Sequence, residues 1–203
     1  MAVKLTKNEQ KLQKDRLKQY ERYLPTLQLK KQQLQMVIRQ IEAEIERNRR
    51  AQRRLVQDMQ SWIGVYGENP YLEEGLSIES LIKIETIVKS RGNIAGVIIP
   101  VFEELTFAQV PYDLVRYPLW VDRGLESLRE YARLDALIAT LAVQIRLLER
   151  ELRTTSQRVN LFEKVKIPEA KENIRVIGIY LGDQQTAAVV RGKIAKTKLV
   201  GGA

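Results

Sequence analysis

Apolar residues recur at helical spacing through the N-terminal third of the chain. Steps of three and four residues lead from Leu17 to Trp62 along one stripe, the spacing of a coiled-coil seam. Between these two residues the stripe contains Tyr20, Leu24, Leu27, Lys31, Leu34, Ile38, Ile41, Ile45, Asn48, Gln52, Leu55 and Met59. The residues beside the stripe are mainly Gln, Lys, Arg and Glu, which favour helices. The pattern predicts one helix from about Thr6 to Ile63.

A second stripe of the same kind occupies the C-terminal segment. It runs through Leu128, Tyr131, Leu134, Ile138, Leu141, Ile145, Leu148, Leu152, Thr155, Val159 and Phe162, and after Pro168 through Ile174, Ile177, Leu181, Ala188 and Ala195. Because proline suits a first helical turn, the helix is expected to open near Pro118 and to reach Lys198. A short connection makes two such helices antiparallel neighbours, and the end of the longer second helix is left without a counterpart.

The segment between the helices has the composition of strands and turns. Gly64, Gly67 and Gly75 interrupt the helical pattern. Residues 81–89 and 94–107 are rich in β-branched side chains, and Ser90–Asn93 has the composition of a turn, so a β-hairpin is predicted. Pro100 restricts the second strand to a sheet edge or a bulge. An isolated hairpin is only marginally stable in water, so this one needs a surface on which to pack.

The predicted fold class is therefore mainly α. The N-terminal segment, residues 1–63, and the C-terminal segment, residues 119–203, form a long antiparallel two-helix coiled coil. A small central β-hairpin lies within an insert, residues 64–118. Together the three segments are expected to make one rod-like domain.

The composition gives no basis for catalysis. The chain has no cysteine and no histidine, which excludes disulfides, thiolate or imidazole zinc sites and most nucleophile–base pairs. Gly64 and Gly67 follow a helix rather than a strand, so they do not form a nucleotide-binding loop. We expect no catalytic residue, no cofactor and no metal.

The net charge of +9 is unevenly distributed. Residues 1–63 hold 15 Lys and Arg against 7 acids, whereas residues 64–118 hold 4 against 8. Residues 189–203 hold 4 basic residues and no acid. The N-terminus lacks the apolar stretch of a signal peptide, and no window approaches the ~18 apolar residues of a membrane span. We expect a soluble cytoplasmic chain that reaches a membrane only through a complex.

Two basic clusters have several interpretations. Arg47, Arg49, Arg50, Arg53 and Arg54 form the denser one. It is either a solvated face partly paired with Glu126, Glu130 and Asp135, a docking site for an acidic protein, or a nucleic-acid site. The second cluster, Arg191, Lys193, Lys196 and Lys198, is either a solvated helix end or an electrostatic contact inside a partner. Asn48 and Gln52 either set the register of the seam or mark where the helices separate.

One stretch of the second helix carries a family resemblance. Arg158, Val159, Asn160 and Glu163 are followed by Ile167-Pro168, then by apolar residues at helical spacing, Ile174, Ile177 and Leu181, and by Asp183. This series resembles the signature of the D subunit of V/A-type (vacuolar/archaeal-type) rotary ATPases. The lysine-rich start and the two long helices around a small insert are also similar.

The resemblance implies the non-catalytic central stalk, or rotor shaft, of an ATP-driven proton or sodium pump or ATP synthase. Both termini would enter the ring of catalytic (A) and non-catalytic (B) subunits. The opposite end would bind the small F subunit and the funnel-shaped subunit above the membrane ring, at the cytoplasmic face of the plasma membrane. No nucleic acid and no direct membrane insertion are implied. Two alternatives stay open, a basic coiled-coil scaffold outside any motor and a nucleic-acid-binding helical hairpin.

The partner-binding residues are predicted in two places. A two-stranded hairpin exposes backbone groups along its edges, which suits it for binding another chain. The candidates there are Ile82, Ile84, Ile87, Ile98 and Phe102. The second set is the basic end of the chain, Arg191, Lys193, Lys196 and Lys198.

Overall fold

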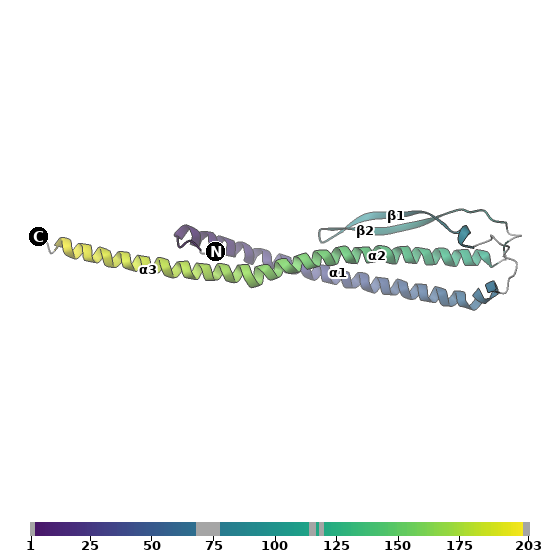
Figure 1. The fold of residues 1–203 in the computed structure, drawn as a ribbon, viewed down its shortest axis with the longest axis horizontal. Helices are drawn as coiled ribbons and strands as arrows, with labels where there is room; N and C mark the ends of the chain where they lie inside the picture. Colours follow the sequence, from purple (N-terminus) through teal and green to yellow (C-terminus); the bar gives the residue numbers. More distant parts are fainter. Residues whose placement is uncertain (1–2, 68–77, 114–116, 118–119, 201–203) are drawn as a thin grey trace. The chain divides into compact units, whose positions relative to one another are not determined.

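The computed structural model describes residues 3–67, 78–113, 117 and 120–200 (Figure 1). Along the chain it contains α1 (Lys7–Gly67), a 3₁₀ turn η1 (Ile78–Leu81), β1 (Lys83–Ile94), β2 (Val97–Ala108), α2 (Val121–Leu161), a π-helical turn η2 (Phe162–Lys166) and α3 (Ile167–Val200). The predicted fold class is confirmed: the chain is mainly helical, with a long helix at each end and one small antiparallel sheet between them.

The ends of the long helices differ slightly from the expected ones. The Thr6 hydroxyl accepts a hydrogen bond from the Glu9 backbone N–H at 3.2 Å and caps the start of α1. The helix continues past Gly64 to Gly67, because a single glycine inside a helix costs only about 1 kcal/mol and does not by itself end it. Pro118 lies outside the described residues, and α2 begins at Val121.

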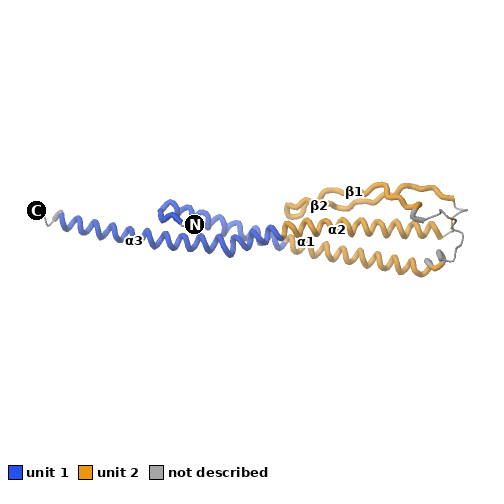
Figure 2. Tube along the Cα trace, in the orientation of Figure 1, with its two compact units in different colours: residues 1–32, 153–203 blue, residues 33–152 orange. Residues whose placement is uncertain are grey.

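Two compact units divide the chain, one of residues 33–152 and one of residues 1–32 with 153–203 (Figure 2). In the first unit, α1 and α2 pack along the seam that the sequence predicts. Its buried core consists of Leu34, Ile38, Ile41, Ile45, Leu141 and Leu148, together with Ile99 from the hairpin. The two helices are antiparallel, and at the far end of this seam the Arg123 guanidinium lies 5.5 Å from the centre of the Trp62 ring.

The hairpin has a different turn from the expected one. Ser90–Asn93 belong to β1, and the strands are joined by Ala95 and Gly96, whose φ angles are 51° and 83°. Two consecutive residues with positive φ make the two-residue turn that matches the twist of a hairpin. The Asn93 side-chain oxygen accepts a hydrogen bond from the Gly96 N–H at 2.9 Å, so this asparagine supports the turn from within the strand.

Gly92 serves strand packing rather than the turn. A Cβ atom at this position would lie 2.9 Å from Cγ2 of Val101 and 3.4 Å from Cγ1 of Ile99. The glycine therefore lets β1 approach the side chains of β2 closely.

The hairpin lies alongside α2 and packs on the helix pair (Figure 1). Ile99 and Leu105 of β2 are only 3% and 2% exposed. The Gln144 amide of α2 donates a hydrogen bond to the Pro100 carbonyl at 2.6 Å. Pro100 thus lies on a strand edge, as predicted, and its carbonyl bonds to a helix. The expected need of the hairpin for a packing surface is met within its own chain.

In the second unit the start of α1 packs against η2 and α3. The rings of Tyr20 and Phe162 lie 5.1 Å apart, and the Lys171 ammonium lies 3.4 Å from the Glu21 carboxylate. Val159, Ala170 and Ile177 are buried, and Ile177 is fully so. The Gln10 side chain lies next to Gly178, whereas Tyr20, ten residues later in α1, contacts Phe162, which precedes Gly178, so this pair is antiparallel too.

The π-helical turn lies directly before Pro168. The Ile167 N–H bonds to the carbonyl of Phe162, five residues back, instead of four. Proline has no N–H and its ring clashes with the carbonyl four residues earlier. The wider turn moves the preceding carbonyls out of the α-helical register and lets the helix continue through the proline.

Candidate partner-binding surfaces

The described residues contain no group of three or more Asp and Glu side chains that could hold a metal ion. Two open grooves lined largely by arginine and glutamine side chains lie beside α1. Such surfaces suit the binding of another macromolecule rather than the enclosure of a small substrate.

We define the hairpin surface as the exposed apolar side chains of β1 and β2: Ile84, Ile87, Val88, Ile98 and Val101. Every residue of β1 from Lys83 to Lys89 is exposed. Ile98 is 66% exposed and Ile84 is 55% exposed, which is unusual for isoleucine in a strand. Several such residues on one short hairpin are typical of a surface that another chain covers.

The five hairpin residues named from the sequence divide into two groups. Ile84, Ile87 and Ile98 belong to the hairpin surface. Ile82 is half-buried and packs against the cluster of Leu81, Val121 and Leu125. Phe102 is half-buried. Ile82 is therefore held at the base of the insert and offers less area to a partner.

Sequence reasoning missed Val88 and Val101, which are also exposed. Val88 pairs with Glu104 and Val101 with Ser90 across the sheet. A polar residue opposite each valine was a signal that these positions are not in the core.

Aromatic and cationic contacts hold the end of the hairpin that is opposite its turn. The guanidinium groups of Arg129 and Arg133 lie 6.0 and 5.6 Å from the centre of the Phe107 ring. The Tyr112 hydroxyl donates a hydrogen bond to the Asp122 carboxylate at the start of α2, and this bond raises the pKa of Tyr112. These contacts fix the strand ends on the helix that carries the hairpin.

We define the tail surface as the part of α3 from Gly182 to Lys198, in which every side chain is exposed. It contains the four predicted cations, Arg191, Lys193, Lys196 and Lys198. Among the described residues none of the four has an ion pair. The tail also exposes Val189, Val190 and Ile194, between 50% and 59%, which sequence reasoning about charge overlooked. The tail is therefore both basic and apolar.

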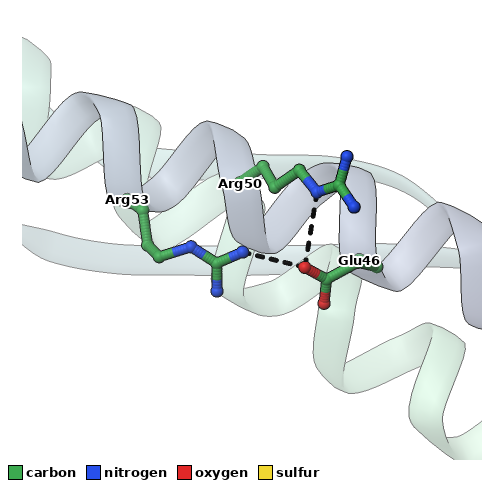
Figure 3. A network of polar contacts seen from close by, with 3 residues as sticks. All are labelled: Glu46, Arg50 and Arg53. Carbon is green, nitrogen blue, oxygen red and sulfur yellow. Dashed lines mark hydrogen bonds and ion pairs between the residues drawn. The ribbon is translucent and has the colours of Figure 1, made fainter.

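The arginine cluster of α1 pairs within its own helix. The Glu46 carboxylate lies 2.8 Å from Arg53 and 3.4 Å from Arg50 (Figure 3). Hydrogen bonding to Arg53, more than to Arg50, lowers the pKa of Glu46 below its ordinary value. The expected pairing with Glu126, Glu130 and Asp135 is absent among the described residues, and Glu130 instead contacts Arg133.

No helix in the described ranges is long and apolar enough to cross a membrane.

Comparisons with known proteins agree on one family. Residues 9–197 match the model of the ATP synthase D-subunit family. The chain is 52% identical over 198 residues to the V-type ATP synthase D subunit of Borreliella burgdorferi, covering 98% of this chain and 95% of the relative. It is 35% identical to the protein of the same name from Chlamydia abortus, covering 97% and 93%, and 34% identical to that of Chlamydia caviae, with the same coverage.

The matches extend over nearly the whole of each chain, both long helices and the insert included. The chain therefore belongs to the family of ATP synthase D subunits and is a component of a V-type ATP synthase.

Proposed function

We propose that this subunit is the central stalk of the complex and transmits torque between the catalytic ring and the ion-translocating ring of the membrane. It makes this contribution without an active site of its own. The observation that carries the proposal is the tail surface, where every described side chain from Gly182 to Lys198 is exposed. A helix end with apolar and basic side chains and no packing of its own is suited to lie inside a collar formed by other chains.

The proposal assigns the two surfaces to different partners. The tail surface contacts the ring of A and B subunits. The hairpin surface contacts the small F subunit and the funnel-shaped subunit above the membrane ring. Both contacts lie on the cytoplasmic face of the membrane, and the chain is peripheral there.

Charge on the tail suits a part that turns inside a collar. Electrostatic attraction acts over several ångströms and does not require side chains to interdigitate. Tightly packed apolar side chains, in contrast, would hold the helix in one orientation. The four cations therefore guide and centre the helix while still allowing it to move from one orientation to the next. Exposed ion pairs contribute only ~0–1 kcal/mol each, so none of them holds the shaft in place.

Truncation after Leu181 tests the proposal in the assembled complex. The truncation removes only exposed side chains among the described residues, so the rest of the chain keeps its packing. ATP-driven ion pumping should fall more than ATP hydrolysis, because the hydrolytic residues belong to other chains. Both activities are measured on membrane vesicles that contain wild-type or truncated complex. Pumping and hydrolysis that both stay at wild-type values would contradict the proposal.

A further inference from the structure

An open groove lies beside the stretch of α1 in which the residues of the seam are no longer buried. Leu34, Ile38, Ile41 and Ile45 are buried, but no described side chain of α1 from Glu46 to Trp62 is. The groove encloses about 570 Å³. Ala51, Leu55 and Leu134 line its apolar part, and Arg47, Arg50 and Arg54 line its basic part.

The charge of this groove is not balanced within the chain. Arg47 and Arg54 form no ion pair with any described residue. Arg50 shares Glu46 with Arg53, and the shorter contact is the one to Arg53 (Figure 3). The carboxylates that also line the groove are Glu130, which contacts Arg133 at 3.5 Å, and Asp58. Positive charge therefore exceeds negative charge along this face of α1.

Gln52 lies in the same stretch of α1 and has an unsatisfied polar group. Its side-chain nitrogen is buried and has no hydrogen-bond partner among the described residues. A buried amide without a partner is costly, so a polar group of this stretch is left unsatisfied within the described part of the chain.

The spacing of the arginines indicates what kind of chain fits. Arg47, Arg50 and Arg54 are separated by three and four residues, so they lie on one face over two helical turns, about 10 Å. A second helix with carboxylates at the same spacing can place one beside each guanidinium, and arginine binds carboxylates with two parallel hydrogen bonds. The apolar lining of the groove suits the aliphatic side of such a helix rather than a sugar–phosphate backbone.

We propose that this groove binds an acidic amphipathic helix of another subunit of the V-type complex. The three arginines bind its carboxylates, and Ala51, Leu55 and Leu134 receive its apolar side chains. The proposal rests on membership in the complex and not on the transmission of torque. It concerns a surface separate from the hairpin surface and the tail surface.

Glutamine substitutions test the charge contribution. The variant R47Q/R50Q/R54Q removes three charges and keeps good helix formers. Its matched control is K11Q/K14Q/K18Q, because these exposed lysines have the same spacing on the same helix and lose the same net charge. Each of the other soluble subunits, purified separately, is titrated with the full-length wild-type chain and with both variants.

For one of these subunits we expect the Kd to rise at least ten-fold in the arginine variant, which corresponds to about 1.4 kcal/mol, and to change less than two-fold in the control. Equal effects of the two variants on every subunit, or no subunit that binds the wild-type chain, would overturn the proposal. Loss of binding to a nucleic-acid duplex without loss of binding to any subunit would overturn it as well. The pumping assay of the truncated chain is independent of these outcomes, so the two proposals can fail separately.

A steric test distinguishes the groove from a general effect of charge. Ala51 and Ala43 are both exposed on α1, but only Ala51 lines the groove. A51W should weaken binding of the same subunit at least ten-fold, whereas A43W should leave it within two-fold. A photoreactive residue at position 51 of the assembled complex should then cross-link to a helix rich in Asp and Glu. Unchanged binding by A51W, or a cross-link to a segment without acidic residues, would refute the proposed occupant.

Discussion

Ile99 holds the hairpin on the helix pair, and its neighbour Ile98 does not. Ile99 is 3% exposed in the core between α1 and α2, whereas Ile98 is 66% exposed. The two residues have the same side chain and are adjacent in β2. I99A and I98A thus remove the same atoms from opposite environments.

The expected cost of I99A follows from burial. Replacing a buried isoleucine by alanine costs about 2–5 kcal/mol, and the lower end applies here because the hairpin covers only one side of the helix pair and can partly settle into the vacated space. About 2 kcal/mol raises the opening equilibrium of the hairpin roughly 30-fold. I98A should cost less than ~0.5 kcal/mol, since exposed positions contribute little.

Hydrogen exchange measures this difference directly. Amide protection in β1 and β2 should fall in I99A, while protection in α1 and α2 away from the hairpin should change much less. The strands should keep wild-type protection in I98A. Equal protection of β1 and β2 in the two variants would refute the idea that Ile99 anchors the hairpin.

Three further results are expected. I84S/I98S should weaken binding of the F subunit, whereas the control L29S/M36S, which changes similarly exposed residues of α1, should not. Isothermal titration calorimetry of F with each variant measures this. Unchanged binding by I84S/I98S would argue against the hairpin surface. Replacing Arg191, Lys193, Lys196 and Lys198 together by glutamine should weaken assembly with the ring of A and B subunits at low salt. The effect should be smaller at high salt, because salt screens charges over ~8–10 Å near physiological ionic strength. A sedimentation assay at two salt concentrations measures this, and a variant that assembles as well as the wild-type chain at both concentrations would contradict it. The pKa of the Glu46 carboxyl, measured by NMR, should lie below its ordinary value and should rise in R53Q. The contribution of this ion pair to folding stability is therefore present above the unfolded-state pKa and is lost as the pH falls through the folded-state pKa. An unchanged pKa in R53Q would show that Arg53 is not the cause.

The two seams could be predicted from the sequence because burial follows a simple period. Leu34, Ile38, Ile41 and Ile45 recur at steps of three and four, and all are buried. A hairpin between the helices was predictable for a similar reason, since β-branched runs bounded by glycine and proline have few other solutions.

The hairpin turn could not be placed from local composition alone. Gly92-Asn93 and Ala95-Gly96 both have turn chemistry, and they lie close together in the sequence. The choice between them depends on the register in which Ile99 reaches the core between the helices, and this is a tertiary constraint. The pairing of Glu46 with Arg50, in contrast, could have been found from their i, i+4 spacing.

The π-helical turn identifies the place where this helix can change in length. Thr155 and Ala170 are both buried and stand fifteen residues apart, one more than two heptads, and Ile177 follows Ala170 by one heptad. The wide turn from Phe162 to Lys166 takes up the extra residue, so buried positions on both sides stay on the same face. A chain with one residue fewer between Phe162 and Ala170, and without Pro168, would keep its packed positions as an uninterrupted α-helix. Natural insertions and deletions in this long helix are therefore expected to concentrate at this turn, where a change of one residue leaves the buried positions on the same face of the helix.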